Sequence, residues 1–405
     1  MLRSSGFGFA VVGAIVLLGG PVACSTHDST APGGRGAMVS TIPLTQLSTE
    51  QTAAYLAEAV RTKPDTPVRN GVDAYRVVYK TVNPDGSPTT ATGLVVLPRT
   101  NSHRLRVVSY EHGTMSARKD APSVSALNGP DRACAIMFAA AGYAVVAPDY
   151  LGLGEGPGPH PYVHVPTETS ASIDLLRAAR TLTEQQQREL DPDVLVTGAS
   201  QGGTAATCLA KALVGGQAPG FGLAALAPVS GPYDLQHVDV PAGPSGRIDS
   251  RVAVFYFSYW ITAMNRIYHF YDEPSEAFQR PYATTVESLF DGQHDEREIG
   301  NSLPGTLQEL LTPQFIDRLL HPAGSVLKAM TDSDGTCDWT PQVPVHLYHS
   351  TGDRDVPYAN AEACLRAFHS DKVTLTNLGD TDHETTIRLA LPRILDQFLQ
   401  EVPAT

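Results

Sequence analysis

A serine between two glycines is the residue of this chain best placed for covalent chemistry. It lies in the pentapeptide 198–202, which reads Gly-Ala-Ser-Gln-Gly. The apolar residues 194–197 before it predict a strand, and the residues from Gly203 on predict a helix. At a sharp turn between a strand and a helix, two glycines leave the serine exposed at the end of the strand. We therefore predict that Ser200 is a nucleophile, with a plain structural turn as the alternative.

A serine hydroxyl attacks well only when a histidine takes its proton and a carboxylate orients that histidine. In a strand–turn–helix arrangement these residues follow in the order serine, acid, histidine. Asp353 comes after a predicted strand at 343–348, and His383 comes after the last predicted strand, before the final helix. We predict His383 as the base and Asp353 as its acid. Asp355 is the alternative acid, and Asp234 is a third choice.

An attacked carbonyl oxygen becomes negative and needs backbone N–H donors around it. Gln201 follows Ser200 at the start of a helix, so its N–H is the first predicted donor. The second is expected in the turn after an early strand, from Thr114 or, as the second choice, from Gly113. Asp149 also follows a strand but precedes the serine in the chain. We predict that it accepts hydrogen bonds that brace a loop.

The composition indicates a large folded protein with an acidic surface. Of the 405 residues, 42% are hydrophobic and 18% are charged, which excludes disorder for the chain as a whole. The 29 basic and 42 acidic residues leave a formal net charge of −13, which argues against nucleic-acid partners and against electrostatic docking on an anionic bilayer. No His/Cys group has zinc-site spacing, so we expect neither a metal nor another cofactor.

The elements that must position these residues alternate along most of the chain. A helix is predicted at 48–62, followed by a hairpin of two strands at 74–82 and 90–97 around Asn-Pro-Asp-Gly. From there on we predict strands at 105–110, 143–147, 194–197, 221–229, 343–348 and 373–378, and helices at 131–141, 168–181, 203–214, 358–368 and 384–399. Such alternation predicts an α/β fold with a mostly parallel central sheet and helices on both faces.

The segment 232–341 interrupts this alternation and is interpreted as an inserted helical cap or lid. It separates the two parts of the α/β core, 48–231 and 342–405. Between Phe255 and Phe290 it contains eleven aromatic residues, whereas aromatic residues make up 7% of the whole chain. Such enrichment is typical of apolar pockets and interfaces. We expect that some of these side chains pack the cap itself and that others line a pocket over the sheet.

The first 47 residues are predicted to form a signal peptide followed by a flexible tether. A basic Arg3, an apolar run at 7–18 and small residues after it predict a signal peptide at 1–24. Cys24 resembles the acylated cysteine of a bacterial lipoprotein, with simple cleavage as the alternative. Residues 25–47 are predicted to form a flexible tether. The chain is thus expected to be exported and either secreted or held at the cell envelope. In the second case, a lipidated Cys24 would attach it to the membrane.

An exported chain can form disulfides. Four cysteines remain beyond Cys24, and we prefer the pair Cys337–Cys364 because these two bracket one strand and the helix after it. Cys134 and Cys208 are expected to be free thiols in apolar helices.

From about residue 72 to 399 the chain resembles the α/β-hydrolase superfamily, and within it the secretory lipase family of lipase-A-like enzymes. The resemblance rests on Pro-Asp-Tyr at 148–150, on 198–203, on Thr-Gly-Asp-Arg-Asp-Val-Pro at 351–357, and on the large cap. It implies hydrolysis of carboxylic esters through an acyl-enzyme, with catalytic roles for Ser200, Asp353 and His383.

The leading hypothesis is therefore an exported esterase or lipase that acts on a small-molecule or lipid ester. The alternative is a serine peptidase or an acyltransferase of the same fold. A third hypothesis is a non-enzymatic surface protein that binds ligands at a vestigial site.

Overall fold

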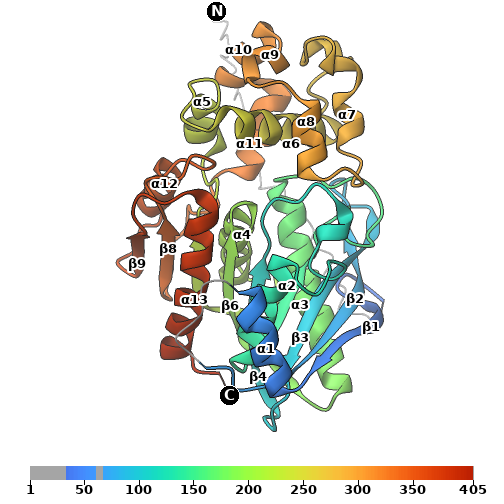
Figure 1. Ribbon diagram of the computed structural model, residues 1–405, viewed down its shortest axis with the longest axis vertical. Coiled ribbons are helices and arrows are strands. Elements are labelled where there is room, and N and C mark those ends of the chain that lie inside the picture. The colour runs from blue at the N-terminus through green and yellow to red at the C-terminus, as the bar shows by residue number, and fades with distance from the viewer. Residues whose placement is uncertain (1–32, 61–66, 405) are drawn as a thin grey trace, which may run out of the picture.

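The computed structural model describes residues 33–60 and 67–404 (Figure 1). The predicted signal peptide at 1–24, including Cys24, lies outside the described residues, as does the first part of the predicted tether. Among the described residues, no helix combines the length and the apolar character that crossing a bilayer requires.

One twisted sheet forms the centre of the molecule, with strands in the order β1-β2-β3-β5-β4-β6-β7-β8-β9 over the described residues. The strands are β1 (Met38–Leu47), β2 (Val72–Val82), β3 (Pro88–Pro98), β4 (Arg104–Glu111), β5 (Ala144–Pro148), β6 (Glu189–Ala199), β7 (Gly222–Val229), β8 (Val345–His349) and β9 (Val373–Asn377). The first four strands in the sheet order are antiparallel, and the strands from β5 to β9 run parallel. The predicted mostly parallel sheet is confirmed.

The tether predicted for residues 25–47 is wrong over its last ten residues. Met38–Leu47 form strand β1, which pairs antiparallel with β2 at the sheet edge and joins the core. The linker was inferred from the Ser, Thr, Gly and Pro residues of 25–40, but Val39, Thr41 and Ile42 are β-branched and suit a half-exposed edge strand. Backbone pairing with β2 then supplies the hydrogen bonds that a tether would leave to water.

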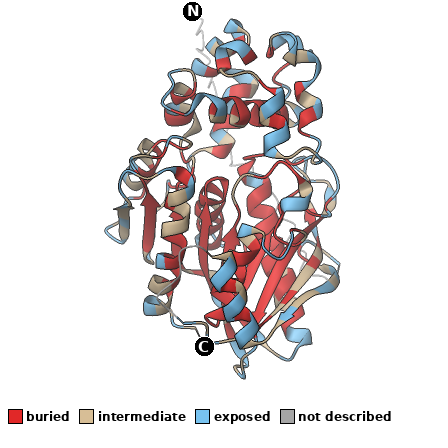
Figure 2. Cartoon of the chain, in the orientation of Figure 1, coloured by how far each residue is buried: buried red, intermediate tan, exposed pale blue. Residues whose placement is uncertain are grey.

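Helices cover both faces of the sheet, as predicted. On one face lie α1 (Thr49–Ala59), α2 (Pro130–Ala140) and α13 (His383–Glu401), and on the other lie α3 (Val165–Gln185), α4 (Gln201–Val214) and α12 (Ala359–Ala367). The central strands between them are buried along most of their length (Figure 2). Burial on both faces explains why these strands read as continuous apolar runs rather than alternating ones.

A helical cap is inserted between β7 and β8 and lies at the top of the molecule in Figure 1. After a single π-helical turn at Leu235–Asp239 come α5 (Val240–Ala242), α6 (Ser250–Tyr268), α7 (Val286–Leu289), α8 (Glu296–Ser302), α9 (Leu307–Leu310), α10 (Pro313–Leu320) and α11 (Gly324–Ser333). The cap has an apolar cluster of its own. Eight of the eleven aromatic residues between Phe255 and Phe290 are buried in that cluster, so most of them serve the packing of the cap.

Two contacts hold the cap where it leaves and rejoins the sheet. Asp334 lies near the end of the cap, and its carboxylate accepts hydrogen bonds from two backbone N–H groups at the beginning of the cap, those of Leu235 (2.7 Å) and Gln236 (3.2 Å). Just beyond, Cys337 and Cys364 form the predicted disulfide, with Cα atoms 5.2 Å apart. Cys134 and Cys208 are free thiols, as expected, and both are half-buried.

Candidate active site

Ser200 occupies the turn between strand β6 and helix α4 in a conformation that non-glycine residues rarely adopt. Its φ and ψ are 57° and −126°. Holding such a conformation costs about 1–3 kcal/mol and persists only where the surroundings impose it. Here the Ser200 N–H donates to the Val229 carbonyl (2.9 Å), and the Ser200 carbonyl accepts from the Gly203 N–H (2.8 Å). The turn is thus fixed by the backbone of the neighbouring strand β7 and of α4 itself.

The two glycines around Ser200 are required by close backbone approach. A Cβ atom at Gly202 would overlap the backbone oxygen of Glu111, and one at Gly198 would overlap the backbone oxygen of Gly202. Any larger residue would push the turn away from strand β4, which ends at Glu111. This packing is the reason for the Gly-x-Ser-x-Gly spacing, and it holds Ser200 at the carboxyl end of the central strands.

Asp353 and His383 meet beyond the ends of strands β8 and β9. Nδ1 of His383 lies 2.7 Å from Oδ2 of Asp353, and both side chains are buried. His383 is the first residue of α13 rather than a loop residue, and the preceding Asp382 caps that helix. The other carboxylate oxygen of Asp353 accepts from the backbone N–H groups of Asp355 and Val356, both at 3.0 Å. The acid is therefore held from two sides.

A second histidine, His349, which was not predicted from the sequence, contacts the same carboxylate. Nε2 of His349 donates to the Val356 carbonyl (3.0 Å) and lies 3.3 Å from Oδ2 of Asp353. Burial raises the pKa of Asp353, but hydrogen bonds from His349 and His383 outweigh burial and hold that pKa well below its ordinary value. Asp353 is thus ionised at neutral pH.

Asp353 acts on the imidazole of His383 in turn. Burial lowers the pKa of His383, but the hydrogen bond and the charge of Asp353, with a further contribution from Asp355, raise it above its ordinary value. Within residues 33–60 and 67–404, the buried Nε2 atom of His383 has no hydrogen-bond partner, so it is not hydrogen-bonded to Ser200 in this structure. The structure therefore pairs His383 with Asp353 and leaves Nε2 available.

The two alternative acids lie elsewhere. Asp355 lines the cavity next to Ser200, and only its backbone N–H contacts Asp353. Asp234 accepts from the backbone N–H of His237 (3.0 Å) and pairs with its ring (2.8 Å). Of the three acids considered, it is Asp353 that hydrogen-bonds to His383.

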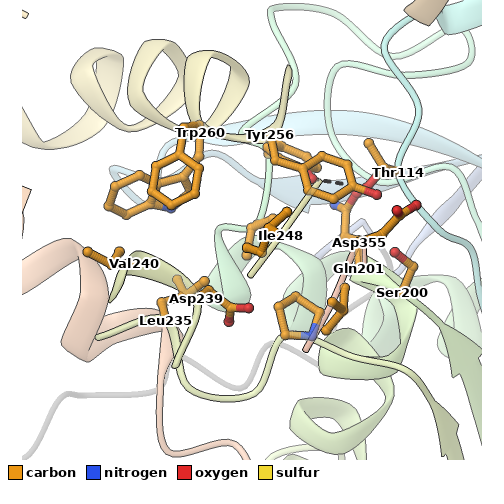
Figure 3. Close-up of a pocket in the computed structure, with 15 residues that line it drawn as sticks. Thr114, Ser200, Gln201, Leu235, Asp239, Val240, Ile248, Tyr256, Trp260 and Asp355 are labelled. Atoms are coloured by element: carbon orange, nitrogen blue, oxygen red, sulfur yellow. Dashed lines mark hydrogen bonds between the residues drawn. The ribbon is translucent and has the colours of Figure 1, made fainter. Parts of the chain in front are cut away.

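The three residues predicted to surround an oxyanion all lie beside Ser200. Gln201 is the first residue of α4, where backbone N–H groups have no partner within the helix. Thr114 lines the same cavity as Ser200 and Gln201 (Figure 3). A Cβ at Gly113 would lie 3.6 Å from Cβ of Ser200, so Gly113 is a direct neighbour as well. The Thr114 hydroxyl is 3.0 Å from the Tyr162 hydroxyl, which fixes its side chain.

The side chain of Gln201 contacts two buried residues that were not predicted from the sequence. Its Nε2 donates to Oε1 of Glu168 (2.7 Å) and lies 3.2 Å from Nε2 of His160. Nδ1 of His160 donates to the Leu151 carbonyl (2.8 Å), so Nε2 accepts from Gln201. Burial lowers the pKa of His160 to about 3 and raises that of Glu168 to about 8, so both are neutral at pH 7.

Asp149 braces a loop, as predicted. Its carboxylate accepts from the Ser123 backbone N–H (2.9 Å), from the Ser123 hydroxyl and from the Thr92 hydroxyl (2.6 Å). Its Oδ2 atom also occupies the position that a Cβ at Gly154 would need. Asp149 therefore ties strand β3 to two loops.

A cavity lies between Ser200 and the cap. Ser200 is only 6% exposed, because the cap closes over it. The cavity is lined mainly by apolar side chains; from the cap come Leu235, Asp239, Val240, Ile248, Tyr256, Phe257 and Trp260, and from the core come Thr114, Tyr162, Val163, Ser200, Gln201, Pro232, Asp355 and Val356. Tyr256, Phe257 and Trp260 are the members of the aromatic-rich segment that reach this cavity. The expectation that part of that segment lines a pocket is confirmed.

Comparison with known proteins gives a consistent result. The sequence profile of the alpha/beta hydrolase family matches residues 135–387. The rice cell wall degrading esterase LipA from Xanthomonas oryzae superposes with a TM-score of 0.83 at 28% identity, over 91% of this chain and 99% of that one. Candida antarctica lipase A in its closed state superposes with a TM-score of 0.63 at 16% identity, over 87% of this chain and 79% of that one, a likeness of fold. A search of curated proteins gave no match. The predicted resemblance to the α/β-hydrolase superfamily is confirmed.

Proposed function

The chain belongs to the alpha/beta hydrolase family, and from this premise we propose that it is a serine hydrolase that cleaves carboxylic esters. One observation carries the proposal. Ser200, at a strained turn, and the N–H donors predicted at Gln201 and Thr114 border one apolar cavity, and a His383–Asp353 pair at 2.7 Å follows the last two strands. LipA, the structural neighbour at 28% identity, is described as an esterase, which supports the same reaction class.

In the first half of the proposed reaction, Ser200 Oγ attacks the ester carbonyl carbon. His383 Nε2 takes the serine proton, and the adjacent Asp353 carboxylate stabilises the imidazolium that forms. The carbonyl oxygen becomes negative and is held by the N–H groups of Gln201 and Thr114. Collapse of this tetrahedral intermediate breaks the ester C–O bond, and His383 gives the proton to the departing alkoxide. The products are a free alcohol and an acyl group on Ser200.

The second half repeats these steps with water as the nucleophile. His383 Nε2 takes a proton from water, the resulting hydroxide attacks the acyl carbon, and the same N–H donors hold the oxyanion. Expulsion of Ser200 Oγ, which takes the proton back from His383, releases the carboxylic acid. The apolar lining from Leu235, Val240, Ile248 and Phe257 fits an alkyl or acyl group during both steps.

The proposal is tested with p-nitrophenyl esters from acetate to palmitate and with the Ser200→Ala variant. Loss of the nucleophile is expected to reduce turnover by several powers of ten. Ester turnover by folded wild-type protein that disappears in the variant supports the assignment. Absence of turnover at every chain length, together with cleavage of p-nitroanilide amides, would replace it with the peptidase alternative.

We also propose that the chain is exported and that Cys24 attaches it to a membrane through an acyl group. The charged and apolar pattern of residues 1–24 supports export, and the Cys337–Cys364 disulfide suits an oxidising compartment. Expression of the full chain beside a Cys24→Ser variant tests both points by fractionation and by incorporation of labelled palmitate. Recovery of the disulfide-bonded wild-type chain in the envelope and label only in the wild type support the proposal. Recovery of both in the cytosol contradicts export.

A further inference from the structure

On the cap side of the cavity wall, two buried polar atoms have no hydrogen-bond partner among the described residues. They are Oδ2 of Asp239 and Nε1 of Trp260, in side chains of residues that are 5% and 6% exposed. Both residues belong to the cap and line the cavity on the side away from Ser200 (Figure 3). Buried polar groups are nearly always paired in folded proteins. Two unpaired groups in residues that line one cavity therefore point to a ligand that pairs with them.

The carboxyl group of Asp239 is fixed in place through its other oxygen. Oδ1 accepts from the Asn360 amide nitrogen at 2.8 Å. The Asn360 amide oxygen accepts from the backbone N–H groups of Tyr233 (2.9 Å) and Asp234 (3.0 Å), so the orientation of this amide is settled. Asp239 thus has a defined position: Oδ1 is hydrogen-bonded to Asn360, and Oδ2 has no partner among the described residues.

The charge state of Asp239 indicates what kind of group it accommodates. Burial raises the pKa of Asp239 to about 8, and the nearby acids Asp334, Asp234 and Asp353 add to this effect against the hydrogen bond from Asn360. Asp239 is therefore mostly a neutral carboxylic acid at pH 7, which can both donate and accept a hydrogen bond. A cationic group would require the ionised form, so a neutral partner fits better.

Trp260 offers a donor from a similarly rigid position. Its ring packs against Phe270 with centroids 5.4 Å apart, inside the apolar cluster of the cap. An indole N–H only donates, so its missing partner is an acceptor atom. An anionic acceptor is disfavoured, since the residues that line the cavity include two acids, Asp239 and Asp355, and no lysine, arginine or histidine.

A hydroxyl group is a neutral partner that suits either residue. Its oxygen accepts from the Trp260 N–H, or its proton is donated to Oδ2 of Asp239, or its oxygen takes the Asp239 proton. We propose that the cavity selects esters in which a hydroxyl group is carried on the otherwise apolar chain that enters it. This inference rests on the proposed ester hydrolysis and names its substrate class. Sites that hydrogen-bond a substrate hydroxyl discriminate strongly against analogues without one, because their own buried groups then stay unpaired.

The test compares matched ester pairs that differ by one hydroxyl. The first arm uses p-nitrophenyl esters of ω-hydroxy acids and of the corresponding plain acids, from four to twelve carbons. The second arm uses butyrate monoesters of α,ω-diols and of the corresponding plain alcohols. At one or two chain lengths, wild-type kcat/KM is expected to favour the hydroxylated ester about tenfold or more. The arm in which this occurs identifies whether the acyl or the alcohol chain enters the cavity.

The Trp260→Phe variant is the sharpest change, because it removes the N–H and keeps an aromatic ring. It is expected to bring the hydroxylated-to-plain ratio of kcat/KM close to one. Trp339→Phe is the matched control, since Trp339 donates to the Thr336 carbonyl (3.0 Å) away from the cavity. This control is expected to keep the wild-type ratio.

Two results would overturn the proposal: a wild-type ratio near or below one at every length in both arms, or a Trp260→Phe variant with the wild-type ratio. Failure of ester hydrolysis itself is recognised separately, because the wild type would then cleave no ester of either kind. In that case calorimetric binding of α,ω-diols against plain alkanols, in the wild type and in Trp260→Phe, still tests the hydroxyl site. Equal binding of both ligand types by the wild type would contradict it.

Discussion

The sheet and the cap border the same serine, but they constrain the site through different parts of the chain. On the sheet side, main-chain atoms set the position of Ser200: the Val229 carbonyl accepts its N–H, and the Glu111 carbonyl packs against Gly202. On the cap side, side chains such as Phe257 and Trp260 face the cavity. Reactivity thus depends on a backbone arrangement that most substitutions at the turn would disturb. Selectivity depends on side chains that can be exchanged one at a time.

Both regions bury polar groups near the cavity. Beneath the turn, Glu111 accepts from the hydroxyls of Ser109 (2.7 Å), Ser172 (2.8 Å) and Tyr150 (3.2 Å). Burial nevertheless raises the pKa of Glu111 to about 7. The cap leaves Trp260 Nε1 without a partner among the described residues. Among the described residues, unpaired buried atoms therefore lie in both regions, at Nε2 of His383 and Oε1 of Gln201 on the sheet side and at Nε1 of Trp260 on the cap side.

The largest effect is expected from loss of the base on the sheet side. His383→Ala removes the acceptor for the serine proton and should reduce kcat/KM for p-nitrophenyl butyrate by about 10⁴-fold, with an unchanged circular dichroism spectrum. His321→Ala is the control in the cap, where His321 is exposed and paired only with Asp317. It should keep wild-type activity. A His383→Ala variant with more than about a tenth of wild-type activity would refute the assigned role.

Next in size is a disturbance of the backbone around the serine. Gly202→Ala adds a methyl group where the Glu111 carbonyl already lies, so the turn must shift. A displacement of about 1 Å typically costs 10²-fold in rate, so kcat/KM should fall by about that factor.

The matched control for this change is Gly300→Ala in cap helix α8, where an added Cβ meets no other atom within 4 Å. This variant should be fully active and slightly more stable in thermal unfolding, because alanine favours helix by about 1 kcal/mol over glycine. Equal activity of the two glycine variants would show that the turn tolerates displacement.

A cap substitution should change preference rather than reactivity. Phe257→Leu enlarges the cavity and removes aromatic contact with a bound chain. We expect kcat/KM for decanoate to fall about fivefold while that for acetate changes by less than about twofold, because only longer chains reach this side chain. Phe278→Leu, in the cap cluster but outside the cavity lining, should lower the melting temperature and keep the chain-length profile. A uniform loss across all chain lengths in Phe257→Leu would contradict the division of roles.

The smallest effect is expected on the pH profile. His383 must be neutral to accept a proton, and its pKa is raised, so kcat/KM should fall with decreasing pH around a midpoint above about 6.5. The charge of Asp355 contributes to the raised pKa. Asp355→Asn removes this charge, so the midpoint should move to lower pH by about half a unit. Asp317→Asn, an exposed change in the cap, should leave it unmoved; a shift to higher pH in Asp355→Asn would reverse the assigned sign.

Much of the sheet side could be predicted from the sequence, because its determinants are local. A strand, two glycines and a helix start around Ser200 are adjacent in the chain, and the order of Asp353 and His383 follows from the order of the strands. The edge strand β1 was missed because the segment 25–40, rich in Ser, Thr, Gly and Pro, suggested a linker that continues to residue 47. Only pairing with β2, which begins 25 residues after β1 ends, makes it a strand.

The residues that support the site, His349 and Glu168, could not be predicted because their contacts also depend on how the chain folds. His349 contacts Asp353 because the chain folds back after β8, and Glu168 reaches Gln201 from a different helix. Neither lies in a motif, and both act through distances that only the packed structure determines. The same holds for Asp239 and Trp260, whose unpaired atoms are visible only when every neighbouring donor and acceptor has been assigned.

The contact of Asp334 with the N–H groups of Leu235 and Gln236 has a consequence for how such a protein can change. It brings the first and last residues of an insertion of about one hundred residues to a single point beside the sheet. A different insertion with the same two ends could be grafted there without altering the path of any strand. Gene recombination, in nature or in the laboratory, could therefore exchange the whole substrate-facing unit as one cassette and keep the reacting residues unchanged.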